Sequence, residues 1–227
     1  MAVCFKGAHF PADIILTCGR WSVAYPLSTR QVEELMQERG VSVDHSTVNR
    51  WVVKYSPQLE AAFHRRKRPV WRSWRLDETY LRVKGNWSYL YGAVDKTGQT
   101  IDFRLTARRD EPAAKRFLTK AIRRHGVPET ITIDGSEANA AAMRCYNAEH
   151  GTAIVIRRVK YLNNILEQDH RTVKRVTRPR LGFKSFEAAQ CTLAGVELMQ
   201  MLKKGQRMVE EGAEGLTPAA QFYALAA

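Results

Sequence analysis

A change of hydrophobic period near residue 74 constrains the fold of this 227-residue chain more than any other feature. From Trp74 to Val83 polar and apolar side chains alternate and β-forming residues are frequent, which predicts a strand. Two more strands are predicted after it, each preceded by a Gly-containing turn, at 87–95 and 100–106. The three segments together predict an antiparallel meander.

The segments that follow alternate between helical and strand patterns. The predicted helices cover 112–126, 138–149, 164–176 and 185–204, and the predicted strands cover 130–133 and 153–158. Three antiparallel strands, then helix, strand, helix, strand and two helices, is the order of a ribonuclease H-like fold. We therefore expect an α/β domain, with a mixed sheet flanked by helices, over residues 74–205 and a C-terminal tail over 206–227.

Residues 27–55 carry a different pattern, that of two short helices joined by a turn. Ser28 can cap the first helix, Gly40 ends it, and Asp44 or Ser46 can cap the second. This spacing predicts a small all-α helix-turn-helix domain over residues 1–56, in which a further helix at 13–25 packs. A helical hairpin with a polar face is the alternative that the pattern leaves open. In the DNA-binding interpretation the second helix presents five side chains to a major groove: His45, Thr47, Asn49, Arg50 and Lys54.

The charge balance favours a polyanionic partner. Lys and Arg number 36 against 23 Asp and Glu, a formal net charge of +13, and such side chains release counterions when they bind a phosphate backbone. The stretch HRRKRPVWRSWR (64–75) is basic and contains two tryptophans. We therefore expect residues 57–73 to form a basic linker, which either lies on DNA or is simply solvated.

Several classes of protein are excluded by what the sequence lacks. No stretch has the ~18 uncharged apolar residues of a membrane helix, and charges interrupt the N-terminal segment where a signal peptide would be apolar. The chain has no Walker loop, no G-x-G-x-x-G and no H-E-x-x-H. The four cysteines lie far apart, which predicts free thiols: Cys4, Cys18, Cys145 and Cys191. We expect a cytoplasmic protein with no membrane partner and no small-molecule cofactor.

Three carboxylates stand out when the predicted elements are placed on a ribonuclease H-like fold. Asp77 lies inside the first strand, Asp134 directly follows the strand at 130–133, and Glu167 lies on the first turns of the helix at 164–176. On that fold the first and fourth strands are neighbours and the helix crosses them. The three carboxylates therefore converge.

Such a cluster is unfavourable unless a divalent cation neutralises it. Oxygen ligands suit Mg²⁺ or Mn²⁺, and two ions per site can activate a water or a 3′-hydroxyl for displacement at a phosphodiester. Each acid also has an ordinary interpretation, since Glu167 could pair with Arg171 at i, i+4. Asp169 and His170 are rival ligands, which we expect to lie around the metal site or to contact DNA.

The third carboxylate lies in a strongly basic part of the chain, since residues 157–184 carry nine Lys and Arg against two acids. Lys174 follows Glu167 by seven residues, two helical turns along one face, where it can hold a phosphate beside the metal site. We count it among the catalytic residues. The other DNA contacts expected in this stretch are Arg171, Arg175 and Arg178.

At this point the sequence resembles the DDE transposases of the insertion sequence six family of bacterial mobile elements. The strings that carry the resemblance are WRLDETY, YLYGAVD, TIDFRL, ITIDGS, VKYLNNILEQDHRTVKR and LGFKSF. The resemblance covers nearly the whole chain. It implies that Asp77, Asp134 and Glu167 form the metal-binding triad, followed by Lys174. It also implies a helix-turn-helix that recognises terminal inverted repeats, and a homodimer or higher homo-oligomer that pairs two ends.

The resemblance thus implies a DNA polynucleotidyl transferase acting in transposition, located in the bacterial cytoplasm and on the nucleoid when bound to DNA. Gly92 and Gly19 depart from the family pattern, because relatives commonly carry Arg at the first position and a larger residue at the second. Two alternatives remain. One is a DNA-binding regulator with a non-catalytic nuclease-like domain. The other is a structure-selective nuclease of the same fold that hydrolyses DNA but never joins it.

Overall fold

The computed structural model describes residues 3–208 and 215–226, and the chain divides into two compact units. A sheet unit comprises Pro69–Thr172, and a helical unit comprises Met1–Arg68 together with Val173–Ala227. Helix α6 (Asn164–Thr177) begins in the sheet unit and ends in the helical unit. The predicted strands and helices are present, with ends that agree within two residues except for the second helix of 27–55, which extends to His64.

The sheet unit has five strands: β1 (Ser73–Val83), β2 (Asn86–Asp95), β3 (Thr100–Thr106), β4 (Thr130–Ile133) and β5 (Val155–Arg158). Their order across the sheet is β3-β2-β1-β4-β5. β1 pairs antiparallel with β2 and parallel with β4, so the expected neighbourhood of the first and fourth strands is confirmed. This pairing is that of a ribonuclease H-like fold.

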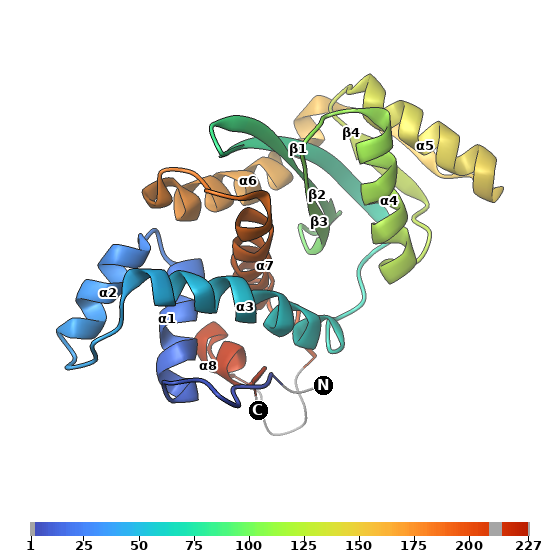
Figure 1. Cartoon of the computed structure of the whole chain (residues 1–227). Helices are drawn as coiled ribbons and strands as arrows, with labels where there is room; N and C mark the ends of the chain where they lie inside the picture. Colours follow the sequence, from blue (N-terminus) through green and yellow to red (C-terminus); the bar gives the residue numbers. More distant parts are fainter. Residues whose placement is uncertain (1–2, 209–214, 227) are drawn as a thin grey trace. The chain divides into compact units, whose positions relative to one another are not determined.

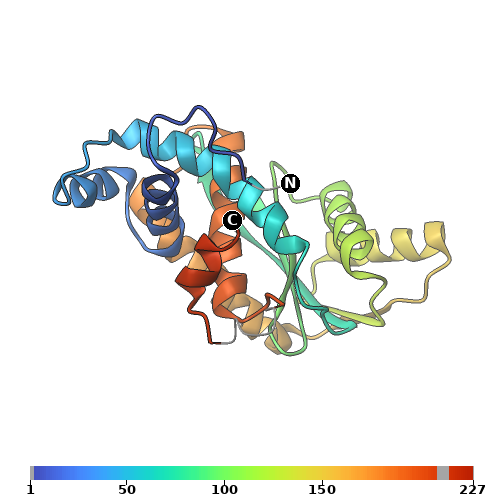
Figure 2. The same cartoon turned by 90° about the horizontal axis from the view of Figure 1, so that it is seen from below.

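Helices α4 (Glu111–His125) and α5 (Glu137–His150) lie on one side of this sheet in both views (Figures 1 and 2). Alternation along β1 turns Trp74 and Leu76 toward them, and both side chains are buried. Between sheet and helices lies one apolar core, whose larger members include Trp74, Tyr91, Ile101, Phe117, Leu118, Ile131, Ile133 and Met143. Burial of these apolar side chains stabilises the sheet and fixes the positions at which its strands end.

Two helices joined by a turn are present where the sequence predicts them. Helix α2 (Thr29–Gln37) begins with a capping box between Ser28 and Gln31, and Asp44 caps α3 (His45–His64). Gly40 adopts a left-handed φ of 73° in the turn between them. The apolar faces of both helices are buried, including Val32, Met36, Val48, Trp51 and Val52.

Helix α7 (Phe186–Lys203) packs against α1 (Ala12–Ala24) and α3 within the helical unit. A Cβ added at Gly195 of α7 would lie 2.7 Å from both Ser56 Oγ and Val23 Cγ1, so only glycine permits this close approach. The space beside Gly19 in α1 is open instead, since no atom lies within 4 Å of an added Cβ. Nothing in the structure therefore prevents the larger residue that relatives carry there.

The compact units differ from the predicted domain boundaries. Residues 57–64, predicted as the start of a linker, continue α3. Pro57 removes one helical hydrogen bond at a cost of about 3 kcal/mol. Burial of Leu59 and Phe63, at roughly 1.5–3 kcal/mol each, offsets that cost.

A second difference concerns the C-terminal part of the chain. Helix α7 was expected in the α/β domain, yet it belongs to the helical unit because its residues 192–202 are all buried there. Within the expected tail at 206–227, Pro218–Tyr223 forms α8, which buries Phe222 and packs on α7. Residues 209–214 and 227 of that tail lie outside the described residues.

The cysteines and the hydrophobicity of the helices can be read directly from the structure. All four cysteines are free thiols, as predicted. Among the described helices, none is long and apolar enough to cross a membrane.

Candidate active site

Asp77 lies in the middle of β1, on the face opposite to Trp74 and Leu76, and is paired in register with Gly92 of β2. Its side chain is only 15% exposed. Burial, together with the negative charges of Glu78, Asp134 and Glu167, raises the pKa of this carboxyl to about 7. The structure therefore brings all three predicted acids within electrostatic reach of one another at Asp77.

Asp134 reaches this position through the parallel register of β1 and β4. Arg75 of β1 is level with Thr132 of β4, and the same offset continued by two residues makes Asp134 level with Asp77. Asp134 is exposed, and its Oδ1 accepts a hydrogen bond of 3.1 Å from the backbone N–H of Ser136. Ser136 in turn caps α5. The end of β4 and the start of α5 therefore hold this carboxylate at the carboxyl end of β4.

Glu167 is exposed in the first turn of α6, and its place depends on the residues just before that helix. A short 3₁₀ helix, η1 (Lys160–Asn163), leads into α6. The buried Asn163 donates a 3.2 Å hydrogen bond from Nδ2 to the backbone carbonyl of Leu76, one residue before Asp77. This hydrogen bond holds the start of α6 beside β1, and Glu167 is thereby close enough for its charge to act on Asp77.

His170, one turn after Glu167, lies against Asp77, with 3.9 Å between His170 Nδ1 and Asp77 Oδ2. Gly92 makes room for it. A Cβ added at Gly92 would lie 3.3 Å from His170 Nε2 and 3.4 Å from Leu166 Cδ1, so a larger side chain would have to displace the imidazole or the start of α6. Gly92 thus leaves room for the imidazole beside Asp77.

The other face of β1 carries a charged network that the sequence analysis missed. Glu78 is buried, with 3% of its side chain exposed, and forms an ion pair with Arg109. Asn139 of α5 donates a 2.9 Å hydrogen bond from Nδ2 to Glu78 Oε2. The pKa of Arg109 is raised, against the effect of its partial burial, by the charges of Glu78 and Asp134. Strand alternation could have revealed this network, because it places Glu78 on the same face as Trp74 and Leu76.

Asp77, Asp134 and Glu167 fit a divalent cation chemically. They offer carboxylate oxygens, the donors that Mg²⁺ and Mn²⁺ prefer, and a cation would relieve the repulsion that raises the pKa of Asp77. In the described part of the chain, the one group of three potential ligands with all ligand atoms within 4.8 Å lies elsewhere, at Glu33, Asp44 and His45. Glu33 Oε2 already accepts a hydrogen bond from the backbone N–H of His45 and lies 2.9 Å from its Nδ1, and Asp44 Oδ1 accepts one from the backbone N–H of Ser46.

The predicted DNA contacts of the recognition helix have different surroundings. Asn49, Arg50 and Lys54 are exposed on α3. His45 is half-buried, and its Nδ1 lies 2.9 Å from Glu33 Oε2 of α2. Thr47 accepts a 2.7 Å hydrogen bond from Arg50. The three exposed side chains are therefore the best placed of the five to meet DNA.

The basic residues expected after Glu167 lie along α6 and just beyond it. Arg171, Arg175 and Arg178 are exposed, and Lys174 is half-buried. Lys174 and the residues after it belong to the helical unit, whereas Glu167 belongs to the sheet unit. The role of Lys174 as a phosphate ligand therefore stays a prediction.

Comparison with protein families gives a direct match. The family model of a transposase DDE domain matches residues 71–206, which include the three carboxylates. Two curated relatives from Staphylococcus aureus match over 211 residues, which are 89% of this chain and 90% of each relative. The transposase for the insertion sequence-like element IS431mec is 37% identical, and the transposase for element IS257 in transposon Tn4003 is 36% identical.

Solved structures give more distant matches. The chain is similar to the integrase catalytic core domain of HTLV-2 in complex with magnesium, with 14% identity and a TM-score of 0.44 over 69% of this chain and 97% of that one. It is also similar to a chain of the simian T-cell lymphotropic virus intasome, with 16% identity and a TM-score of 0.47 over 69% of this chain and 55% of that chain.

Proposed function

The chain belongs to the DDE transposases of the insertion sequence six family, and we propose that it nicks the ends of its own insertion sequence and joins them to target DNA at the Asp77 site. The observation that carries this proposal is the convergence of three carboxylates from distant parts of the sequence. The β1–β4 register makes Asp134 level with Asp77, and the hydrogen bond from Asn163 to Leu76 holds the start of the helix that carries Glu167 beside β1. The raised pKa of Asp77 agrees with this arrangement. Nothing in the fold of the sheet requires such a concentration of negative charge.

In the first proposed step, a water oxygen attacks the phosphorus at the end of the element. The bond from phosphorus to the 3′ oxygen breaks, the departing 3′ oxygen takes up the proton that the water gives up, and the products are a free 3′-hydroxyl and a 5′-phosphate. In the second step that hydroxyl attacks a target phosphodiester, so that one P–O bond forms, one breaks and the target strand is left with its own 3′-hydroxyl. No covalent protein–DNA intermediate and no other co-reactant is needed.

Asp77, Asp134 and Glu167 would hold two divalent ions, Mg²⁺ or Mn²⁺. When bound, such ions supply an activated nucleophile and stabilise the leaving oxygen. The protein's own contribution is to hold three carboxylates from β1, β4 and α6 at one sheet edge before DNA arrives. Glu78, Arg109 and Asn139 would act as positioning residues from the opposite face of β1.

We further propose that the helix-turn-helix recognises the terminal inverted repeats through Asn49, Arg50 and Lys54, which are exposed on α3. Arg171, Lys174, Arg175 and Arg178 would hold DNA phosphates near the reacting strand. Because an element has two ends that must be held side by side before each is joined to the target, the active species would be a homodimer or a higher homo-oligomer.

The test uses purified full-length protein, labelled duplex carrying the terminal repeat, a target plasmid, and Mg²⁺ or Mn²⁺. Wild type should give nicked and joined products, and both should fall below detection in Asp77→Asn and Glu167→Gln. Glu129→Gln serves as the matched control, because Glu129 is an exposed acid of the same unit and should leave both products unchanged.

Other outcomes would overturn the proposal. Sequence-specific binding without nicking in either metal would indicate a regulator. Nicking without joining would indicate a hydrolytic nuclease. Loss of both products in Glu129→Gln as well would show that the assay responds to any lost carboxylate and not to the Asp77 site.

A further inference from the structure

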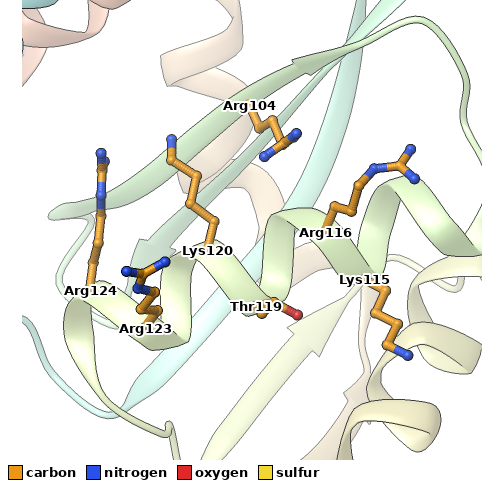
Figure 3. Close-up of a pocket in the computed structure, with 7 residues that line it drawn as sticks. All are labelled: Arg104, Lys115, Arg116, Thr119, Lys120, Arg123 and Arg124. Carbon is orange, nitrogen blue, oxygen red and sulfur yellow. The ribbon is translucent and has the colours of Figure 1, made fainter.

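One face of the sheet unit carries a concentration of positive charge that the proposed chemistry does not use. A basin of about 700 Å³ lies between α4 and β3 and is lined by Arg104, Lys115, Arg116, Thr119, Lys120, Arg123 and Arg124. Figure 3 shows Arg104 projecting from the strand and the others from successive turns of α4. Six of the seven lining residues are cationic and none is acidic.

Part of this charge has a structural purpose. Lys120 Nζ lies 2.8 Å from Oδ1 of the buried Asp102, and Arg124 Nη1 lies 3.3 Å from its Oδ2. Although burial opposes ionisation, these two cations hold the pKa of Asp102 below its usual value. Lys115 forms an ion pair with Glu149 of α5. Three of the six cations are therefore accounted for by the fold.

Arg104, Arg116 and Arg123 differ, because none of them has an acidic partner within the residues that the structure describes. Arg116 and Arg123 are exposed, and Arg104 is half-buried. Arg123, in the last turn of α4, gains some stability from the helix dipole, but Arg116 in mid-helix and Arg104 on a strand do not. No acidic side chain is among the residues that line the basin, so the mutual repulsion of these three arginines is not offset within it. The fold thus tolerates a repulsive face that a polyanion would relieve.

The dimensions of this face match a duplex backbone. Arg116 and Arg123 are seven residues apart, which is about 10 Å along a helix axis. Each DNA strand carries one phosphate per about 3.4 Å of duplex axis, so such a span meets about three phosphates. The lining offers guanidinium and ammonium groups with one threonine, a set suited to phosphate oxygens and not to reading base edges.

We propose that the α4–β3 basin binds the phosphate backbone of target DNA, independently of its sequence. The proposal rests on the proposed function, since it assigns the basin to the second DNA of the joining step. Sequence-independent binding suits a target, whereas the terminal repeats require a surface that reads bases.

The test compares Arg104→Gln/Arg116→Gln/Arg123→Gln, which keeps both cations of Asp102, with an equal loss of charge on the same unit. The matched control is Arg82→Gln/Lys84→Gln/Lys96→Gln, whose three parent residues are exposed. Binding of each protein to a duplex without terminal repeats is measured by fluorescence anisotropy over a range of salt. Joining of a pre-nicked end to a plasmid is measured in parallel with hydrolytic nicking of the end.

The basin variant should bind the non-specific duplex about tenfold more weakly at low salt, and the slope of log K against log salt should become shallower by about 2.7 for three lost contacts. Joining should fall while nicking persists, and the control variant should resemble wild type. An equal loss of duplex binding and joining in the control variant would show that the effect comes from net charge alone, and it would overturn the proposal. An unchanged salt slope, or nicking lost in step with joining, would overturn it as well.

Two further arms keep the result interpretable. If the triple variant melts at a lower temperature by circular dichroism, the single exposed reversal Arg116→Glu replaces it and should weaken duplex binding in the same direction. If wild type itself joins no DNA, the proposed function fails. The salt slopes of the basin and control variants then still decide whether the basin binds duplex DNA.

Discussion

The molecule contains two groups of acids that look alike in composition and differ in environment. In the sheet unit, Asp77 is buried, faces the charges of Asp134 and Glu167, and has its pKa raised to about 7. In the helical unit, Asp44 is exposed at the start of α3, where hydrogen bonds from the Ser46 hydroxyl and backbone N–H lower its pKa. Asp44 and Glu33 also flank His45.

The difference is our reason for placing the proposed metal site at Asp77. The ligand atoms of Glu33, Asp44 and His45 lie closer together, yet hydrogen bonds and a histidine already satisfy them. Asp77 is less well satisfied, because burial removes water and its neighbours add negative charge. We therefore assign the proposed cation to the Asp77 group on its unrelieved charge and not on proximity alone.

The largest expected effect is on stability without metal. Replacing Asp77 by Asn removes a carboxyl whose pKa is about 7 in the folded chain, against 3.8 for an unperturbed aspartate. The folded state binds its proton more tightly, so the ionised carboxylate destabilises the fold above pH 7, and this penalty disappears as pH falls toward 4. Asp77→Asn should therefore unfold in EDTA with a free energy higher by roughly 1–4 kcal/mol at pH 8.

Urea denaturation at pH 8 and at pH 4 checks this expectation, and the gain should vanish at the lower pH. Asp134→Asn is the comparison variant, because Asp134 is exposed and should give a smaller gain. A destabilised Asp77→Asn at pH 8 would contradict the assignment of unrelieved charge to this carboxylate.

Next in size is stabilisation by metal. Mn²⁺ at a hundredfold excess over its Kd should stabilise the folded wild type by about 2.7 kcal/mol, seen as a rise in Tm. The rise should be lost in Asp77→Asn and kept in Asp44→Asn. A rise in Tm that is lost in Asp44→Asn and kept in Asp77→Asn would instead place the metal at Glu33, Asp44 and His45.

A smaller effect is expected from Glu78→Gln, which keeps the shape of the buried network but removes its charge. Activity should fall roughly 10- to 100-fold, as for groups that orient metal ligands. Because Glu78 helps to raise the pKa of Asp77, the acidic limb of the pH–rate profile should also move to lower pH. If the rate fell but the acidic limb of the pH–rate profile stayed in place, Glu78 would have only a packing role. Glu129→Gln again provides the control.

The smallest effect is expected at Asp44. Asp44→Ala removes the side-chain cap of α3 and should lower Tm slightly, whereas Asp44→Asn keeps a capping oxygen and should restore most of the loss. Nicking by both variants should match wild type when DNA binding is saturated. A large loss of nicking in Asp44→Asn would mean that this group takes part in the chemistry.

Much of this structure is predictable from local pattern. The alternation from Trp74, the turns before the next two strands and the capping box at Ser28 each depend on neighbours in sequence, and the elements appear where they predict. The triad is also within reach of such reasoning, because element order implies that β1 and β4 are neighbours. By contrast, the continuation of α3 through Pro57 depends on what Phe63 packs against, which no local pattern contains.

The sequence by itself determined the order of strands and helices, the positive charge and the identity of three acids at the ends or centres of those elements. Only the tertiary structure decided that α7 belongs with α1 and α3, that Glu78 is paired inside the core, and that Arg104, Arg116 and Arg123 have no acid to pair with in the described chain. Secondary structure follows from periodicity and capping over a few residues. Burial and charge pairing depend on groups brought together from distant positions, and these interactions set the protonation of Asp77.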